Sequence, residues 1–94
     1  MSYSFSIIGV NKADAKAAAT NRLDLEIQQQ PAHSRDREAH LSNLDKLLAL
    51  VDEAKDHEEV VVSMHGSVAV WDGRVMAAGG GCDVRVQQRV AASS

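Results

Sequence analysis

Two histidines in the first half of the chain have a spacing that could begin a metal site. His33 and His40 are seven residues apart and could share one face of a helix with Arg37. The usual zinc-binding pair on a helix has i, i+4 spacing, and the remaining ligands would have to come from elsewhere in the fold. We therefore expect solvent-exposed histidines near the start of a helix, and no metal site.

A second group, His65, Cys82 and Asp83, contains the residue types of a thiol nucleophile and its base. A nucleophile needs that base within hydrogen-bonding reach, but strand alternation places His65 on the opposite side of the sheet from Cys82. We expect Cys82 to be a small buried residue. Because no pair of carboxylates stands out in an apolar setting either, we expect no catalytic residue and no enzyme. A small enzyme built on these three residues is the third-ranked possibility.

The element that must position these residues is a long β-hairpin over residues 60–90. Asp72-Gly73 lies between two alternating apolar runs and is typical of a type I′ turn, whose two central residues have positive φ. In a regular register Val62 and Val84 would face opposite sides of the sheet. One extra residue in the second strand brings them to the same side, so we predict a β-bulge at Gly79-Gly80-Gly81.

The same three glycines could also be interpreted as a phosphate cradle. Phosphate-binding loops typically open a helix, whose N-terminal N–H groups hold the anion. No helical pattern follows Gly81. The bulge is therefore the favoured interpretation.

The upstream sequence predicts one strand and two helices. Residues 2–8 alternate between apolar residues and serines, which is typical of a half-buried strand. Asn11 is the expected N-cap of a helix over residues 12–29, which Pro31 ends. Ser34 is the expected N-cap of a second helix that continues to residue 55 or 56. The expected apolar stripes are Ala15, Ala19, Leu23 and Ile27, widened by Ala18 and Leu25, in the first helix, and Leu41, Leu44, Leu48 and Val51 in the second.

The order strand, helix, helix, strand, strand predicts an α+β fold of two layers. A three-stranded, mainly antiparallel sheet would carry a helical hairpin on one face. We expect the strand order 1-2-3, and the alternative is 1-3-2 with the first and third strands parallel. The 94 residues suffice for one domain, residues 1–94, with residues 91–94 as a frayed tail.

Composition and charge narrow the class of protein. The net charge of −3 argues against a nucleic-acid binder, which usually carries a basic patch. The single cysteine rules out an intrachain disulfide and fits a reducing compartment. No apolar run approaches the length of a membrane span, and no signal peptide is evident. We therefore expect a soluble protein of the cytoplasm that binds neither nucleic acid nor membrane.

The face of the hairpin opposite the valines is the candidate functional surface. It combines small residues with a few polar side chains and one tryptophan, whereas a solvated face would carry more Lys, Glu and Thr. A subunit interface is the first interpretation, a ligand-facing surface the second, and an exposed face without a role the third. The nominated residues are Ser63, His65, Ser67, Trp71, Arg74 and Arg85.

Four segments of the chain resemble a family of small uncharacterised proteins of tailed phages and prophages. The segments are SYSFSI, KADAKAA, QQP followed one residue later by His, and VVSMHGSV. The resemblance covers most of the chain and implies a phage or prophage origin. It adds no catalytic motif and no site residue.

The outline of the chain is also similar to that of the dodecins. These are small strand–helix–hairpin proteins that form hollow oligomers and bind flavin between aromatic residues. The present chain has two helices, which reverses the sense of the second strand, and it places Trp71 at the hairpin turn. The resemblance therefore implies a closed assembly, and we expect no flavin or other cofactor.

Together these features predict a non-enzymatic accessory protein of a phage or prophage. It would act as a homo-oligomeric interaction or structural module in the cytoplasm of the host cell, and association with the virion is an alternative location. The competing function is a module that binds a nucleotide-like small molecule or a host protein and so counters host defence. In that case Arg74, Arg85 and His65 would supply the polar contacts.

Overall fold

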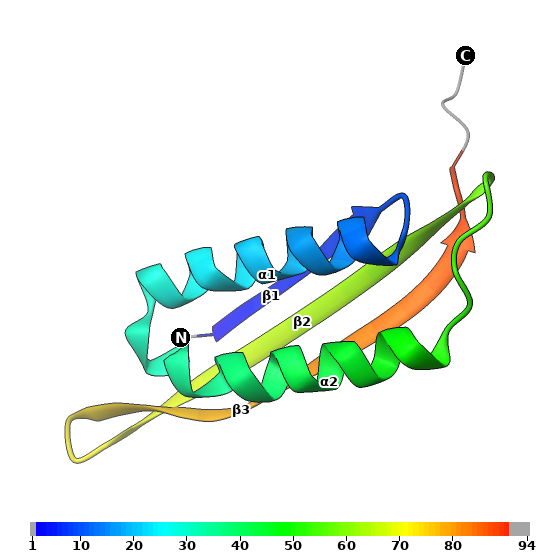
Figure 1. Ribbon diagram of the computed structural model, residues 1–94. Helices are drawn as coiled ribbons and strands as arrows, with labels where there is room; N and C mark the ends of the chain where they lie inside the picture. The colour runs from blue at the N-terminus through cyan, green and yellow to red at the C-terminus, as the bar shows by residue number, and fades with distance from the viewer. Residues whose placement is uncertain (1, 91–94) are drawn as a thin grey trace.

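The fold is a three-stranded antiparallel sheet with both helices on one face (Figure 1). The strand order is β1-β2-β3. This confirms the predicted α+β architecture and the 1-2-3 order. The computed structural model describes residues 2–90, so the expected frayed tail lies outside the described residues. The elements are β1 (Ser2–Gly9), α1 (Lys12–Gln29), the 3₁₀ helix η1 (Pro31–Arg35), α2 (Asp36–Leu50), β2 (Glu58–Trp71) and β3 (Arg74–Gln88).

The first strand and helix form as their sequence predicts. In β1 the serines are exposed while Tyr3 and Phe5 are buried. The Asn11 side chain accepts a hydrogen bond of 2.8 Å from the backbone N–H of Asp14 and so caps α1. Gly9 lets the helix approach closely, because a Cβ there would lie 2.4 Å from the backbone nitrogen of Ala15.

The predicted stripe of α1 is correct except at one edge. Ala15, Ala19 and Leu23 are completely buried, and Ile27 is partly buried against them. Leu25, however, is 53% exposed. It lies two residues from both Leu23 and Ile27, which turns it away from the sheet on a helix of 3.6 residues per turn.

The second helix differs from its prediction at both ends. Ser34 does not cap it, because η1 leads directly into α2 through Arg35, which has helical dihedral angles and makes no side-chain cap. The helix ends at Leu50 rather than at residue 55 or 56. The loop that follows is tied to the start of α1, since Glu53 accepts a hydrogen bond of 2.8 Å from the backbone N–H of Lys12.

The helices and the sheet share one apolar core. Val62 faces Val84 and Met64 faces Cys82 across β2 and β3, so the aliphatic sides of the two strands meet under the helices as predicted. The buried apolar residues of this core are Tyr3, Phe5, Ala15, Ala19, Leu23, Leu44, Leu48, Val60, Val62, Met64 and Val84.

The hairpin has the predicted turn and the predicted bulge. Asp72 and Gly73 have φ angles of 49° and 77°, as a type I′ turn requires. The register shifts between Ser67 and Val68, and the extra residue on β3 is Ala78, immediately before the three glycines. The bulge is thus one residue earlier than its predicted position, and none of the three glycines has positive φ.

The hairpin extends beyond the rest of the fold. β1 pairs with β2 only as far as Ser67, so residues 68–78 form a two-stranded ribbon, here called the arm (Figure 1). At about 3.3 Å per residue β2 spans roughly 46 Å, whereas at 1.5 Å per residue α1 and α2 span only about 27 and 22 Å. α1 and α2 therefore do not cover the arm, in a molecule that measures 52 × 31 × 16 Å.

Candidate interaction surface

The face of the sheet without helices, here called the open face, carries all six nominated residues. Ser63, His65, Ser67 and Trp71 alternate with the buried residues of β2. Arg74 pairs with Trp71 across the turn, and Arg85 pairs with Val61, so both arginines share this face. The other residues of the open face are Ser2, Ser4, Ser6, Ile8, Glu59, Val61, Ala69, Met76, Gly79, Gly81, Asp83 and Gln87.

The centre of the open face is flat, because its side chains are small or lie along the sheet. The hydroxyls of Ser6 and Ser63 are 2.7 Å apart, and the Ser67 hydroxyl donates a hydrogen bond of 3.3 Å to the carbonyl of Gly79. The His65 ring lies over Gly81, where a Cβ would come within 2.7 Å of its Cε1 atom. Another surface could therefore approach the backbone closely here.

Apolar side chains mark the two ends of the open face. At one end Ile8 is 58% exposed beside Val61. At the other end Trp71 is 70% exposed and Met76 is 42% exposed. A hollow of about 440 Å³ lies at the arm end, lined by Ala69, Trp71, Met76, Ala77 and Ala78.

The arm is apolar on its other face as well. Val70 and Val75, which pair across the two strands, are 68% and 42% exposed. They lie on the same side of the ribbon as the core valines but beyond α1 and α2, and only η1 lies nearby, across a hollow that Pro31 and Val75 both line. The arm thus exposes large apolar side chains on both faces.

The polar residues nominated for a small ligand do not converge. Arg85 lies opposite Val61 and Arg74 opposite Trp71, ten residues further along β2. That separation is about 33 Å along a strand. One nucleotide-sized molecule could not touch both arginines, although a protein surface could.

The possible thiol site is not assembled either. Cys82 lies beside Met64 on the core side of the sheet, whereas His65 and Asp83 lie on the open face. Burial, with a smaller contribution from the charge of Asp83, raises the pKa of the Cys82 thiol to about 11. The thiol is therefore protonated at neutral pH and has no adjacent base.

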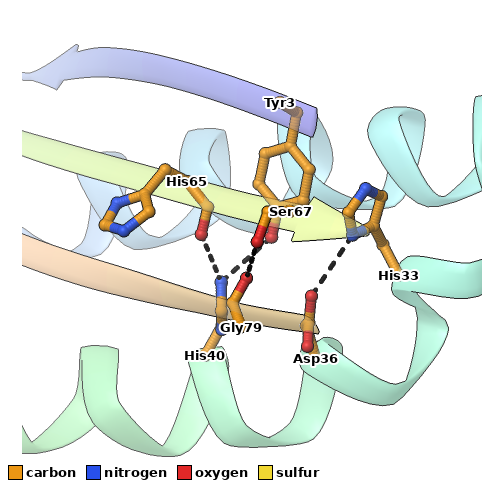
Figure 2. Close-up of polar contacts among 7 residues, drawn as sticks. All are labelled: Tyr3, His33, Asp36, His40, His65, Ser67 and Gly79. Atoms are coloured by element: carbon orange, nitrogen blue, oxygen red, sulfur yellow. Dashed lines mark hydrogen bonds and ion pairs between the residues drawn. The ribbon is translucent and has the colours of Figure 1, made fainter. Parts of the chain in front are cut away.

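The expectation that His33 and His40 are solvent-exposed is wrong. They are 1% and 3% exposed and lie between the helices and the sheet. His40 precedes Leu44 by four residues and therefore belongs to the sheet-facing stripe of α2. Its Nε2 atom is 2.9 Å from the Tyr3 hydroxyl and 3.2 Å from the backbone carbonyl oxygen of His65 (Figure 2).

His33 is buried by η1 and by contact with an aromatic ring. Its ring meets that of Tyr3 edge to face, with the centroids 4.6 Å apart. Its Nδ1 atom is 3.3 Å from a carboxylate oxygen of Asp36 (Figure 2). His33 is the buried residue of this 3₁₀ turn, which the sequence did not predict.

Two glycines of the sheet make room for these rings. A Cβ at Gly66 would lie 2.4 Å from the Tyr3 ring, and a Cβ at Gly80 would lie 2.8 Å from the His40 ring. The residues face each other across β2 and β3. Gly80, which the sequence assigned only to a bulge, therefore also forms, together with Gly66, the surface on which Tyr3 and His40 pack.

Neither a metal centre nor a membrane span is evident in residues 2–90. No group of three or more His, Cys, Asp or Glu side chains in this range could hold a metal ion. The helices described here are too short or too polar to cross a bilayer.

Comparisons with known proteins identified no similar protein. No protein-family model matches the chain, and the searches of curated proteins and of solved structures found no significant match.

Proposed function

We propose that the protein is a non-enzymatic module that associates with a second copy of itself through its open face. The observation that carries the proposal is the arm, which exposes Trp71 and Met76 on the open face of a ribbon that α1 and α2 do not cover. Exposed apolar patches of this kind commonly mark protein interfaces.

The shape of the molecule supports association. A two-stranded ribbon is marginally stable in water unless another layer packs against it. The radius of gyration is 14.8 Å, whereas a compact domain of this length would have about 12 Å. A second copy packed on the open face would supply the missing layer.

The two ends of the open face make it self-complementary. In a two-fold symmetric pair each residue of the patch meets the partner's patch in reverse order. Trp71 and Met76 of one copy would then cover Ile8 of the other, and the flat centre between His65 and Ser67 would lie at the axis. Packed sheets are about 10 Å apart, a distance that the small residues at the centre favour.

The sequence resemblance provides a biological setting for this module. It would be an accessory protein of a phage or prophage that assembles in the host cytoplasm. A host or phage protein that docks on the same face is the second candidate, because the exposed arginines Arg74 and Arg85 suit an extended protein surface rather than a small molecule.

Light scattering and analytical ultracentrifugation of matched variants test the proposal. Ile8→Lys places a charge in the expected interface, whereas Leu25→Lys places one on the outer surface of α1, where Leu25 is 53% exposed. We expect the wild type and Leu25→Lys to be dimers and Ile8→Lys to be a monomer.

A wild-type protein that stays monomeric at every concentration would overturn self-association. If that monomer nevertheless binds a host or phage protein, and Ile8→Lys abolishes the binding, the second candidate is correct. An oligomer that persists in Ile8→Lys and in Trp71→Lys would place the interface elsewhere.

A further inference from the structure

We infer that the hollow beside His33 binds a small planar cation with N–H donors, such as an amidinium or guanidinium group. This hollow lies at the start of β1, and Ser2 is its one open-face residue; Tyr3, Glu26 and His33, which would bind the ligand, lie outside the open face. It has a volume of about 300 Å³, at the lower end of the range of about 300–1,000 Å³ for ligand pockets. Its lining residues are Ser2, Tyr3, Glu26, Gln29, Gln30 and His33.

The first argument is the unsatisfied nitrogen of His33. The side chain is 1% exposed, and its Nε2 atom has no hydrogen-bond partner among the residues that the structure describes. In the neutral imidazole, a carboxylate oxygen of Asp36 that accepts from Nδ1 places the ring proton there and leaves Nε2 as an acceptor. Figure 2 shows this second nitrogen turned away from Asp36.

An unsatisfied buried acceptor is costly, by about 1–3 kcal/mol. His33 lines the hollow but its Nε2 atom is buried, so a ligand with an N–H group would supply the missing hydrogen bond after a small displacement of the side chains that cover this atom. The ligand must therefore be a donor at the point where it meets His33.

The second argument is charge. The Glu26 carboxylate lines the hollow and Asp36 lies directly behind His33. Burial and, after it, the negative charges of Asp36 and Glu26 raise the pKa of Tyr3 to about 12. The local potential is thus negative, although Arg22 neutralises part of it by an ion pair of 3.0 Å with Glu26.

The third argument is that the chain binds its own guanidinium next to the hollow in the same manner. The Arg22 guanidinium is held by Glu26 and lies 5.3 Å from the centroid of the Phe5 ring. Planar cations gain from such contact with an aromatic face. In the hollow, Tyr3 would take the place of Phe5 and His33 would accept the additional N–H bond.

Long-range ¹H–¹⁵N NMR of the full chain with labelled histidine provides the test. Benzamidine is the probe, and the isosteric neutral benzamide and anionic benzoate are its controls. We expect benzamidine to shift the Nε2 resonance of His33 saturably, benzamide to shift it only weakly, and benzoate to leave it unchanged. The exposed His57 should not respond to any of the three compounds.

Two variants connect the binding to the named residues. His33→Phe keeps the ring but removes the acceptor, and it should fold and lose benzamidine binding, measured by calorimetry. His57→Phe is the matched control and should bind as the wild type does. If His33→Phe fails to fold, Glu26→Gln replaces it and should weaken binding about tenfold, as expected for one charge-assisted hydrogen bond.

Two results would overturn the inference. The first is a His33 Nε2 resonance that stays constant in benzamidine, which would mean that the nitrogen is satisfied by internal water. The second is equal binding of benzamidine and benzoate, or undiminished binding in both His33→Phe and Glu26→Gln, since the recognition would then not involve the proposed donor–acceptor contacts.

Discussion

At the scale of single residues, Tyr3 contacts three other rings under the helices. Its hydroxyl meets His40, its ring meets His33, and a second ring contact stacks it on Phe5 at 6.0 Å. It is the only tyrosine of the chain. Its ionisation can therefore be followed separately by absorbance.

The pKa of Tyr3 predicts an alkaline loss of stability. Burial raises this pKa from 10 to about 12 in the folded state, so the folded chain holds the phenolic proton more tightly than the unfolded chain. The resulting stabilisation is fully present below pH 10 and is lost as the pH rises from about 10 to about 12. Urea denaturation across this range should show the loss, and the absorbance of the folded protein should titrate near pH 12.

Tyr3→Phe isolates this effect in a Cys82→Ala background, because the Cys82 thiol also titrates in alkali. The variant should lose about 0.5–1.5 kcal/mol of unfolding free energy at neutral pH, the usual value of one hydrogen bond. The loss should be no larger, because His40 keeps its contact with the backbone carbonyl of His65. It should also lose the decline of stability between pH 10 and pH 12. A tyrosine that titrates at pH 10 in the folded wild type would contradict the buried position.

Cys82 should be an unreactive thiol. Burial and Asp83 raise its pKa from 9 to about 11, so at pH 8 the folded chain contains about a hundredfold less thiolate than the unfolded chain. Thiol labelling at pH 8 should accordingly be at least that much slower in buffer than in urea. Equal rates in both conditions would show that the thiol is exposed.

The burial of the histidines could be predicted only in part from the local sequence. His40 occupies the same stripe as Leu44 and Leu48, a signal that periodicity contained. Its partner Tyr3 is 37 residues away in the chain. A polar ring is stable in a core only when such a partner is present, and no local pattern could identify it.

At the scale of elements, the three glycines combine two roles that the sequence presented as one. The register shift at Ala78 allows Val84 to face Val62. The glycines after it have ordinary φ angles and provide space for His40 on one face and for His65 on the other. The bulge at Ala78 and the packing surface at Gly80 and Gly81 are therefore adjacent features of β3.

Alanine substitutions distinguish the neighbouring glycines. A Cβ at Gly80 would lie 2.5 Å from the carbonyl oxygen of His65 and 2.8 Å from the His40 ring, whereas a Cβ at Gly79 would meet nothing within 4 Å. Gly80→Ala should lose about 1–3 kcal/mol of unfolding free energy, as overpacked sites do. Gly79→Ala should be neutral or slightly stabilising, and equal losses in urea denaturation would contradict the assigned packing.

The second helix illustrates a tertiary effect on an element's length. The apolar period of the sequence continues past Leu50, because Val51 and Ala54 still pack against the core. They do so from a loop, since Val51 is extended with a ψ angle of 149°. The chain must reach the start of β2 at Glu58, and this demand ends the helix before its hydrophobic pattern ends.

At the scale of the whole molecule, the single tryptophan reports directly on the proposed assembly. Trp71 is 70% exposed in one copy, and the proposed contact would cover it. Its fluorescence should shift to shorter wavelength with increasing protein concentration, and the shift should be absent in Ile8→Lys. The emission of a solvent-exposed indole at all concentrations, together with an oligomer by light scattering, would move the interface away from the arm.

The sequence by itself determined the order of the elements, the turn, the antiparallel sheet and the face on which Ser63, His65 and Ser67 lie. These follow from period-2 and period-3.6 patterns and from turn chemistry, which act over a few residues. Only the tertiary structure decided that His33 and His40 are buried, that α2 ends at Leu50, and that the arm extends beyond its helices. Those outcomes depend on which distant side chains meet and on the unequal lengths of strands and helices, because a strand advances about twice as far per residue as a helix.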